Sequence, residues 1–532
     1  MSSTTTIIKH TEPFSTNTLL KNTGVFLGLV GLFALLIFSL PIHFSWAAGN
    51  TPFNISFSLL TAGVLLYTLG MYKGKSDGIK NNHVWFSSLS SKGLYAWLLG
   101  LLLTAFYVLM YWYPQLLGAG EEANSGFIKI FDPLAMKLTG KKASRWFPYG
   151  VLYAWAVLVF GIKFIIKYWG NRYQVIRTLS VIFFQLGFAF LIPNFLEKMG
   201  KPSFDFKDMW PLKYHAVADW SLNGLISNGT IGWIMLLSGI AMVLIVSPIL
   251  TYFYGKRWYC SWVCGCGGLA ETAGDPFRQL SDSSIRAWKI ERWSIHIVLA
   301  LVIIMSIASV YNYLHNFDPE KMQIQIWLSP GSFIAILTVL FSVICFFFYK
   351  NKTAILDKHN RLAFSISIVL LLFIIGALLF NYFVTGSGQL FPINSYKIQE
   401  WYGFFIGAIF SGIVGVGFYP LLGSRVWCRF GCPMAAILGI QQKFFSRFRI
   451  TTNGSQCISC GNCTTYCEMG IDVRAYAEKG QDIVRASCVG CGICSAVCPR
   501  GVLRLENGPN TISKAQDQRN IFIPESDIGI LS

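Results

Sequence analysis

Ten apolar runs, each near twenty residues long, constrain the fold of this chain more than any other feature of its sequence. They occupy residues 24–44, 55–73, 94–113, 147–169, 175–196, 231–254, 293–314, 331–349, 362–384 and 401–420. A helix of about twenty apolar residues crosses the hydrocarbon core of a bilayer. Only 13% of the 532 residues are charged, against about 25% in a typical soluble protein. The sequence therefore predicts an all-α polytopic membrane bundle of about ten transmembrane helices.

Basic residues alternate along the chain and so predict its orientation. Lysines and arginines follow the second, fourth, sixth, eighth and tenth runs, whereas the loops 45–54, 315–330 and 385–400 carry few. Loop 114–146 also holds five basic residues, but it is long, and the positive-inside rule weakens for long loops. We expect a multi-pass protein of the bacterial inner (cytoplasmic) membrane with both termini in the cytoplasm. The net charge of +18 fits such cytoplasmic loops. Because the sequence holds no recognition module or aromatic-basic patch, we expect no nucleic-acid partner.

The chain divides into five parts by composition. The polar start lacks the pattern of a cleaved signal peptide, so the first run should remain as a membrane anchor. We predict a cytoplasmic segment at 1–23, an N-terminal transmembrane part at 24–230, a transmembrane core at 231–449, a cluster-binding domain at 450–506 and a polar tail at 507–532.

Fourteen cysteines are present, and eight of them form one pattern written twice. The pattern C-x₂-C-x₂-C-x₃-C begins at Cys457 and again at Cys488. In this arrangement three cysteines wrap one cubane cluster and the fourth reaches across to the other. The expected ligands of cluster 1 are Cys457, Cys460, Cys463 and Cys498, and those of cluster 2 are Cys488, Cys491, Cys494 and Cys467. These residues predict two [4Fe-4S] clusters.

Zinc knuckles and a disulfide scaffold are the alternatives for these eight cysteines. Zinc sites usually pair two C-x₂-C units and not this triple repeat. The stretch resembles a bacterial two-cluster ferredoxin domain, which implies a C-terminal α+β ferredoxin-like 2[4Fe-4S] fold. One departure is visible, because Glu468 follows Cys467 where Pro499 follows Cys498.

A second cysteine motif is duplicated at the ends of two apolar runs. Gly255, Arg257, Cys260 and Cys264 recur at the same offsets as Gly423, Arg425, Cys428 and Cys432. If helical, C-x₃-C places two thiols on one face. Thiolates select zinc, copper(I) or iron–sulfur centres, so the two pairs predict a third redox centre, redox-active dithiols, or buried thiols without a ligand. Cys266 has no counterpart in the second copy.

Neighbouring arginines should change the pKa values of these thiols. We expect Arg257, Arg425 and Arg429 to lower the thiol pKa values and to offset the charge of a cluster. The remaining cysteine, Cys345, lies alone within the eighth run, and we interpret it as a small buried hydrophobic residue.

The order of helices, duplicated motif and double-cluster tail, over residues 231–505, resembles the membrane polyferredoxin family. Its members include the quinol-oxidising membrane subunit of periplasmic nitrate reductase, the nitrous-oxide-reductase regulator and the cytochrome-oxidase accessory polyferredoxin. Two features depart from it. Gly265 stands where relatives commonly carry proline after the cysteine, and 1–23 is too short for the regulator's exterior flavin-binding domain. We therefore expect no covalent flavin.

The cofactors and the resemblance together predict single-electron transfer. The expected path joins the quinone pool, or an exterior redox protein, to a cytoplasmic partner. Whether the chain is an oxidoreductase subunit or an electron carrier stays open. An assembly factor that reduces a metal for a respiratory enzyme is the alternative. A redox-driven ion pump is disfavoured because the runs hold almost no carboxylates.

The histidines give weaker evidence for a cofactor than the cysteines do. His43 and His315 lie near the predicted outer ends of the first and seventh runs, where a bis-histidine haem would need ligands at matching depth. Interfacial hydrogen bonding explains both residues equally well, and we expect no haem.

Overall fold

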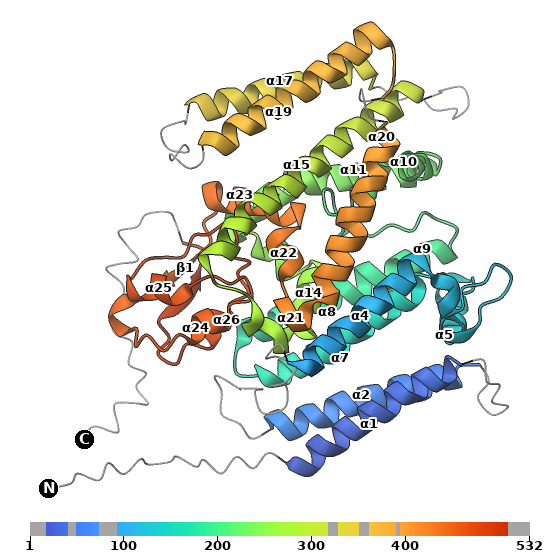
Figure 1. Ribbon diagram of the computed structural model, residues 1–532, viewed down its shortest axis with the longest axis vertical. Helices are drawn as coiled ribbons and strands as arrows, with labels where there is room; N and C mark the ends of the chain where they lie inside the picture. The colour runs from blue at the N-terminus through green and yellow to red at the C-terminus, as the bar shows by residue number, and fades with distance from the viewer. Residues whose placement is uncertain are drawn as a thin grey trace.

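The computed structural model describes residues 17–40, 49–73, 93–317, 328–350, 361–389 and 394–508. Long helices make up most of it, and a small domain that contains the C-terminal cysteines lies at one edge of the helical part (Figure 1). The transmembrane bundle predicted from the apolar runs therefore agrees with a mostly helical architecture.

Nine helical segments in these ranges are long and apolar enough to cross a membrane. They are α1 (Thr18–Phe38), α2 (Thr51–Tyr72), α4 (Leu94–Trp112), α7 (Phe147–Lys167), α8–η2–α9 (Arg172–Lys198), α11–η4–α12 (Gly229–Tyr254), α15 (Ile285–Asn316), Ile368–Thr385 of α19–η6, and α20–η7 (Ser395–Gly417). The eighth predicted run lies in α17 (Pro330–Lys350), where Pro330–Val343 forms a shorter apolar helix.

Four of these segments join an α-helix to π-helical turns. Their component bounds are α8 (Arg172–Phe183), η2 (Phe184–Leu191), α9 (Ile192–Lys198), α11 (Gly229–Ala241), η4 (Met242–Val246), α12 (Ser247–Tyr254), α19 (Arg361–Phe380), η6 (Asn381–Thr385), α20 (Ser395–Trp401) and η7 (Tyr402–Gly417). The first helix also begins before the predicted apolar run. The Asn17 side chain accepts a hydrogen bond from the Leu20 N–H at 3.2 Å, so an N-cap extends the helix into polar sequence.

Helices α1 and α2 form a closely packed pair, side by side in Figure 1. Glycines at their contact allow the two backbones to approach. A Cβ added at Gly63 would lie 2.6 Å from the Gly28 nitrogen and 2.8 Å from the Gly24 oxygen. Small residues at a helix contact are a common packing device in membranes, where lipid provides no hydrophobic drive for helix association.

Short elements connect the long helices and carry the duplicated motif. They are η1 (Pro114–Leu117), α5 (Gly126–Lys129), α6 (Asp132–Thr139), η3 (Tyr214–Val217), α10 (Asp219–Ile226), α13 (Arg257–Cys260), α14 (Gly265–Thr272), η5 (Asp275–Leu280), α21 (Tyr419–Leu422), α22 (Val426–Phe430) and α23 (Pro433–Phe445). Helix α14 packs on α7 and α8, and α22 packs on η7 and α15. Both copies of the motif therefore lie among helices from distant parts of the chain.

The C-terminal domain is built on a two-stranded antiparallel sheet. Strand β1 (Arg449–Thr452) pairs with β2 (Leu503–Glu506), with Arg449 opposite Glu506 and Thr452 opposite Leu503. Between the strands lie η8 (Gly454–Gln456), α24 (Asn462–Thr465), α25 (Val473–Glu478) and α26 (Ile493–Ala496). Pairing of β1 with β2 closes the domain and brings its two cysteine runs together.

The α1–α2 contact gives a first prediction. Gly63→Ala should lower the thermal midpoint of the purified protein, because the added methyl group would meet backbone atoms that cannot rotate away. Overpacking of this kind costs about 1–3 kcal/mol. Gly28→Ala is the matched control, since nothing lies within 4 Å of a Cβ built there. Equal midpoints for the two variants would contradict this packing.

Candidate iron–sulfur sites

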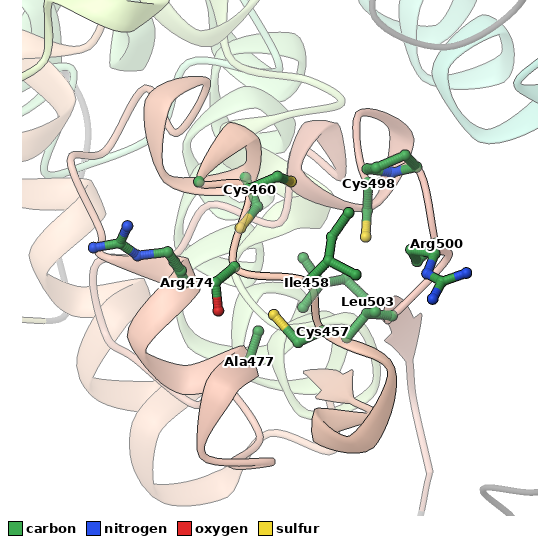
Figure 2. Close-up of a pocket in the computed structure, with 13 residues that line it drawn as sticks. Cys457, Ile458, Cys460, Arg474, Ala477, Cys498, Arg500 and Leu503 are labelled. Carbon is green, nitrogen blue, oxygen red and sulfur yellow. The ribbon is translucent and has the colours of Figure 1, made fainter. Parts of the chain in front are cut away.

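The four cysteines predicted to bind cluster 1 line a single cavity. Cys457, Cys460, Cys463 and Cys498 all contribute to its wall. Figure 2 shows the sulfurs of Cys457, Cys460 and Cys498 pointing into the same space. Cys460 is exposed, so this cavity lies near the surface of the domain. Four convergent thiols fit a [4Fe-4S] cluster.

The same local backbone structure recurs in both cysteine runs. Gly461 and Gly492 each follow the second cysteine, with left-handed φ values of 76° and 75°. Each glycine precedes a four-residue helix, α24 or α26, which carries the third cysteine. Glycine adopts this conformation without the steric cost that a Cβ would impose. The repeat in sequence is therefore a repeat in structure.

The second set of cysteines is more deeply buried. Burial, followed by the neighbouring Cys488, Cys467 and Cys463 thiols, raises the pKa of Cys494 well above its usual value. Burial also raises the pKa of Cys467 to about 12. Mutual influence between thiols requires that they lie close together. Such thiols would stay protonated at neutral pH until a metal displaced their protons.

Four side chains of the helical part donate hydrogen bonds to carbonyl groups of residues 488–491, which we call the cluster 2 loop. The Ser261 hydroxyl donates to Val489 O at 2.8 Å, and the Tyr173 hydroxyl donates to Gly490 O at 2.7 Å. The amides of Gln174 and Gln442 donate to Cys491 O and Cys488 O, each at 2.9 Å. Because Ser261 directly follows Cys260, this loop lies against the first copy of the duplicated motif.

Glu468 joins the C-terminal domain to both copies of the motif. It is 1% exposed, and its Oε2 lies 2.8 Å from Arg278 Nη1. Its Oε1 lies 3.0 Å from Arg425 Nε, an ion pair without hydrogen-bond alignment. Arg425 in turn donates to Cys260 O at 3.1 Å and lies 3.7 Å from the Cys428 sulfur. The residue that departs from the Cys-Pro pattern is therefore an ionic anchor.

A wider network of buried charges surrounds this anchor. Glu271 pairs with Arg177, with Arg278 at 2.8 Å and with Arg425 at 2.7 Å. Asp275 pairs with Arg278 at 2.8 Å and with Lys167 at 2.6 Å. Burial raises the pKa of Asp275, but Lys167 and Arg278 outweigh burial and lower it to about 2.

Two of these carboxylates also lie beside a predicted cluster ligand. Oxygens of Glu271 and Glu468 and the sulfur of Cys491 lie within 4.8 Å of one another. Because arginines already contact both carboxylates, we assign the two acids to the ion-pair network and not to a metal site.

The duplicated motif brings five thiols together. Burial and then the nearby Cys428, Cys264 and Cys260 thiols raise the pKa of Cys432 well above its usual value. Cys266 hydrogen bonds with Cys264 and also interacts with Cys428 and Cys432. The unpaired cysteine of the first copy therefore belongs to the same group as the four duplicated ones, and five thiols could supply a third centre.

The expectation that arginines lower these thiol pKa values is wrong for the net effect on Cys260, Cys428 and Cys432. The pKa of Cys264 is lowered to about 7, but chiefly by its hydrogen bond with Cys266 and not by an arginine. Burial raises the pKa of Cys260 to about 12 and that of Cys428 as well, although Arg425 acts in the opposite direction on both. The other two arginines are used elsewhere. Arg429 pairs with Glu291 at 2.8 Å, and Arg257 donates to Asn507 at 2.8 Å and lies over the Phe448 ring.

Family models agree with this arrangement of cysteines. One described as a 4Fe-4S dicluster domain matches residues 456–503, and one described as a 4Fe-4S binding domain matches twice, at 235–282 and 402–451. The double match agrees with the internal duplication. These findings define the chain as a ferredoxin-type 4Fe-4S protein whose apolar helices are those of a membrane protein.

One similar curated protein is from Escherichia coli (strain K12) and is named "Putative electron transport protein YccM". It is 25% identical over 233 residues, which cover 44% of this chain and 47% of that protein. The chain thus spans about half the length of that relative. No solved structure matches this chain.

Several residues around the sites were not predicted from the sequence. Glu271, Asp275, Arg177 and Arg278 form the network, and Tyr173 and Gln174 come from α8, within the predicted N-terminal transmembrane part. The one sequence feature that could have pointed to this network is Glu468, which follows Cys467 where Pro499 follows Cys498. Of the histidines considered for haem, His43 lies outside the described residues, and His315 is exposed at the end of α15, with its Nδ1 3.4 Å from Asn316 Oδ1.

The Glu468 anchor gives a second prediction. Glu468→Gln should lower the thermal midpoint and speed the release of the C-terminal domain by trypsin, because it removes the charge that faces Arg278 and Arg425. Loss of one partner of a buried pair costs about 3–5 kcal/mol. We expect a cost at the lower end of this range, because Arg278 and Arg425 both still pair with Glu271.

Glu478→Gln is the control for this substitution. Glu478 makes an exposed pair with Arg474 at 3.6 Å, and exposed pairs contribute about 0–1 kcal/mol. If Glu468→Gln were as stable and as protease-resistant as Glu478→Gln, the anchor would not hold the domain.

Proposed function

We propose that this chain is a membrane-bound iron–sulfur electron carrier. It relays single electrons between the quinone pool, or an exterior redox partner, and a cytoplasmic partner. The name of the E. coli relative supports electron transport, and the matches to 4Fe-4S models support the cofactor. Clusters bound to the C-terminal cysteines would accept and release one electron at a time.

The contact between the cluster 2 loop and the duplicated motif is the observation that carries this proposal. Ser261, next to Cys260, donates to the carbonyl of Val489, next to Cys488. Arg425 contacts the Cys428 sulfur and also Glu468, next to Cys467. Two short routes, one through a hydrogen bond and one through an ion pair, therefore lead from the motif cysteines to the predicted ligands of cluster 2.

The exposure of the cysteines supports an order among the three sites. The motif thiols of Cys260, Cys264, Cys428 and Cys432 are buried at the ends of the helices. The cluster 2 residues lie next to them, and Cys463 of the cluster 1 set is close enough to Cys494 to raise the pKa of Cys494. Only the cluster 1 set includes an exposed cysteine among the residues described. We infer the order motif cysteines, cluster 2 site, cluster 1 site.

The rim of the cluster 1 cavity fits an acidic cytoplasmic partner. Arg474 and Arg500 line the cavity and lie on opposite sides of it in Figure 2. Ile458 is 56% exposed beside them. An apolar contact with basic flanks suits a transient electron-transfer complex, in which opposite charges steer the encounter.

We propose further that the five motif thiols hold a third metal centre. They come from both copies of the motif, and four of the five are buried. Burial would keep Cys260, Cys428 and Cys432 protonated at neutral pH until a metal displaced their protons. The match of a 4Fe-4S binding model to each copy supports iron–sulfur chemistry here. Redox-active dithiols are the alternative that the experiment must distinguish.

Iron content tests the number of centres. Anaerobically purified protein should contain about twelve irons per chain if the motif cysteines hold a third cubane, and about eight if only the C-terminal domain holds clusters. Cys428→Ser should lower the iron content by about four atoms. Cys345→Ser, which changes a cysteine of α17 outside all three groups, should leave it unchanged. Full iron in Cys428→Ser with loss of electron transfer would favour dithiols.

Labelling in intact cells tests the orientation of the chain. A membrane-impermeant thiol reagent should reach Ser387→Cys, which lies after the η6 turn on the predicted outer side. Ser455→Cys, exposed in the C-terminal domain, should react only after the cells are permeabilised. The reverse pattern would place the cluster domain outside and end the proposed cytoplasmic role.

A further inference from the structure

An aromatic cavity lies between the membrane helices and the duplicated motif. About 560 Å³ of space lies within it and its mouth, part of it open to the surroundings. Tyr107 and Tyr111 of α4 and Tyr149 of α7 line one side. Cys266 and Cys428, two of the five motif thiols, line another. The cavity therefore connects a bundle of apolar spans to the proposed third centre.

Two polar groups in the cavity wall have no hydrogen-bond partner among the described residues. They are the Ser424 hydroxyl and the Trp427 indole N–H, and the two side chains are 1% and 6% exposed. A buried polar group without a partner costs about 1–3 kcal/mol. Both groups flank Arg425, so the second copy of the motif presents two unused hydrogen-bonding groups at the cavity wall.

We propose that this cavity binds the head group of a lipid-soluble quinone. The inference rests on the proposed function and names the site where a quinone would meet the relay. The Ser424 hydroxyl and Trp427 N–H would donate to quinone oxygens, and the tyrosine rings would pack against the quinone ring. The cavity wall includes residues of α4 and η7, two elements within candidate membrane spans, so the isoprenoid chain would lie on the lipid side of the site.

The wall of the cavity favours a quinone over the other occupants of a membrane pocket. A lipid acyl chain would leave Ser424 and Trp427 unpaired. A charged metabolite would find no cation in this wall, whose residues are aromatic, apolar or neutral polar. A neutral ring with two carbonyl groups matches both the aromatic surface and the unused donors.

Binding of decylubiquinone to the full chain in lipid nanodiscs tests the proposal, with binding to empty nanodiscs subtracted. Ser424→Ala and Trp427→Phe should each weaken binding by about 2- to 10-fold, the value of one hydrogen bond. Ser309→Ala removes another buried hydroxyl that has no partner among the described residues, in α15. Trp97→Phe alters an exposed indole of α4. Both controls should bind as the unaltered chain does.

Decylbenzene, which keeps the chain and ring but lacks the oxygens, is the matched ligand. It should compete weakly with decylubiquinone. Equal competition would make the cavity a slot for lipid and overturn the proposal, as would unchanged affinity in both Ser424→Ala and Trp427→Phe. Thermal midpoints of all variants, measured in the same nanodiscs, show whether each protein is folded.

The iron content of the same samples separates this proposal from the proposed function. Iron-loaded protein that does not bind decylubiquinone would overturn the quinone site and leave the relay standing. Protein without iron that still binds decylubiquinone through Ser424 and Trp427 would support the quinone site and overturn the relay.

Discussion

The buried ion pairs between Glu468 and the arginines Arg278 and Arg425 are the interaction on which the arrangement of the sites depends. A charge removed from water is costly unless a partner compensates it. Glu271, Asp275, Glu468, Arg278 and Arg425 each have two or more partners in this network, whose members are supplied by α7, α8, α14, η5, the second motif copy and the C-terminal domain. Because those elements come from four distant parts of the sequence, the charges can be satisfied only when the cluster domain is docked in one position on the helices.

The docked position of the cluster domain also places the charges of the ion-pair network beside the cluster 2 site. The network contains Lys167, Arg177, Arg278 and Arg425 against Glu271, Asp275 and Glu468, four cations and three carboxylates. One positive charge remains if all are ionised, and Arg278 is close enough to Cys491 for an electrostatic interaction with it. Net charge and hydrogen bonds around the sulfurs tune the potential of an iron–sulfur centre. The same residues that fix the domain would therefore also influence the potential of cluster 2.

Much of the architecture could be predicted from the sequence, because its signals are local. A run of twenty apolar residues predicts its own helix, and the spacing of Cys457, Cys460 and Cys463 predicts its own loop. The anchor and the aromatic cavity depend on partners far apart in the chain. Glu468 lies 190 positions from Arg278, and nothing in the residues around either one indicates the other. The predicted lowering of the Cys260 and Cys428 pKa values was wrong for the same reason. Burial outweighs the effect of Arg425 on both thiols, and burial depends on the packing of the whole protein.

Electron paramagnetic resonance of the anaerobically purified full chain tests the central claim most directly. The predicted ligands of the two clusters are neighbours, because α24, which carries Cys463, packs on α26, which carries Cys494. Reduction with dithionite should therefore produce signals in which the two [4Fe-4S] clusters of the C-terminal domain broaden each other magnetically. A colourless protein, silent after reduction and loaded with zinc alone, would contradict the account.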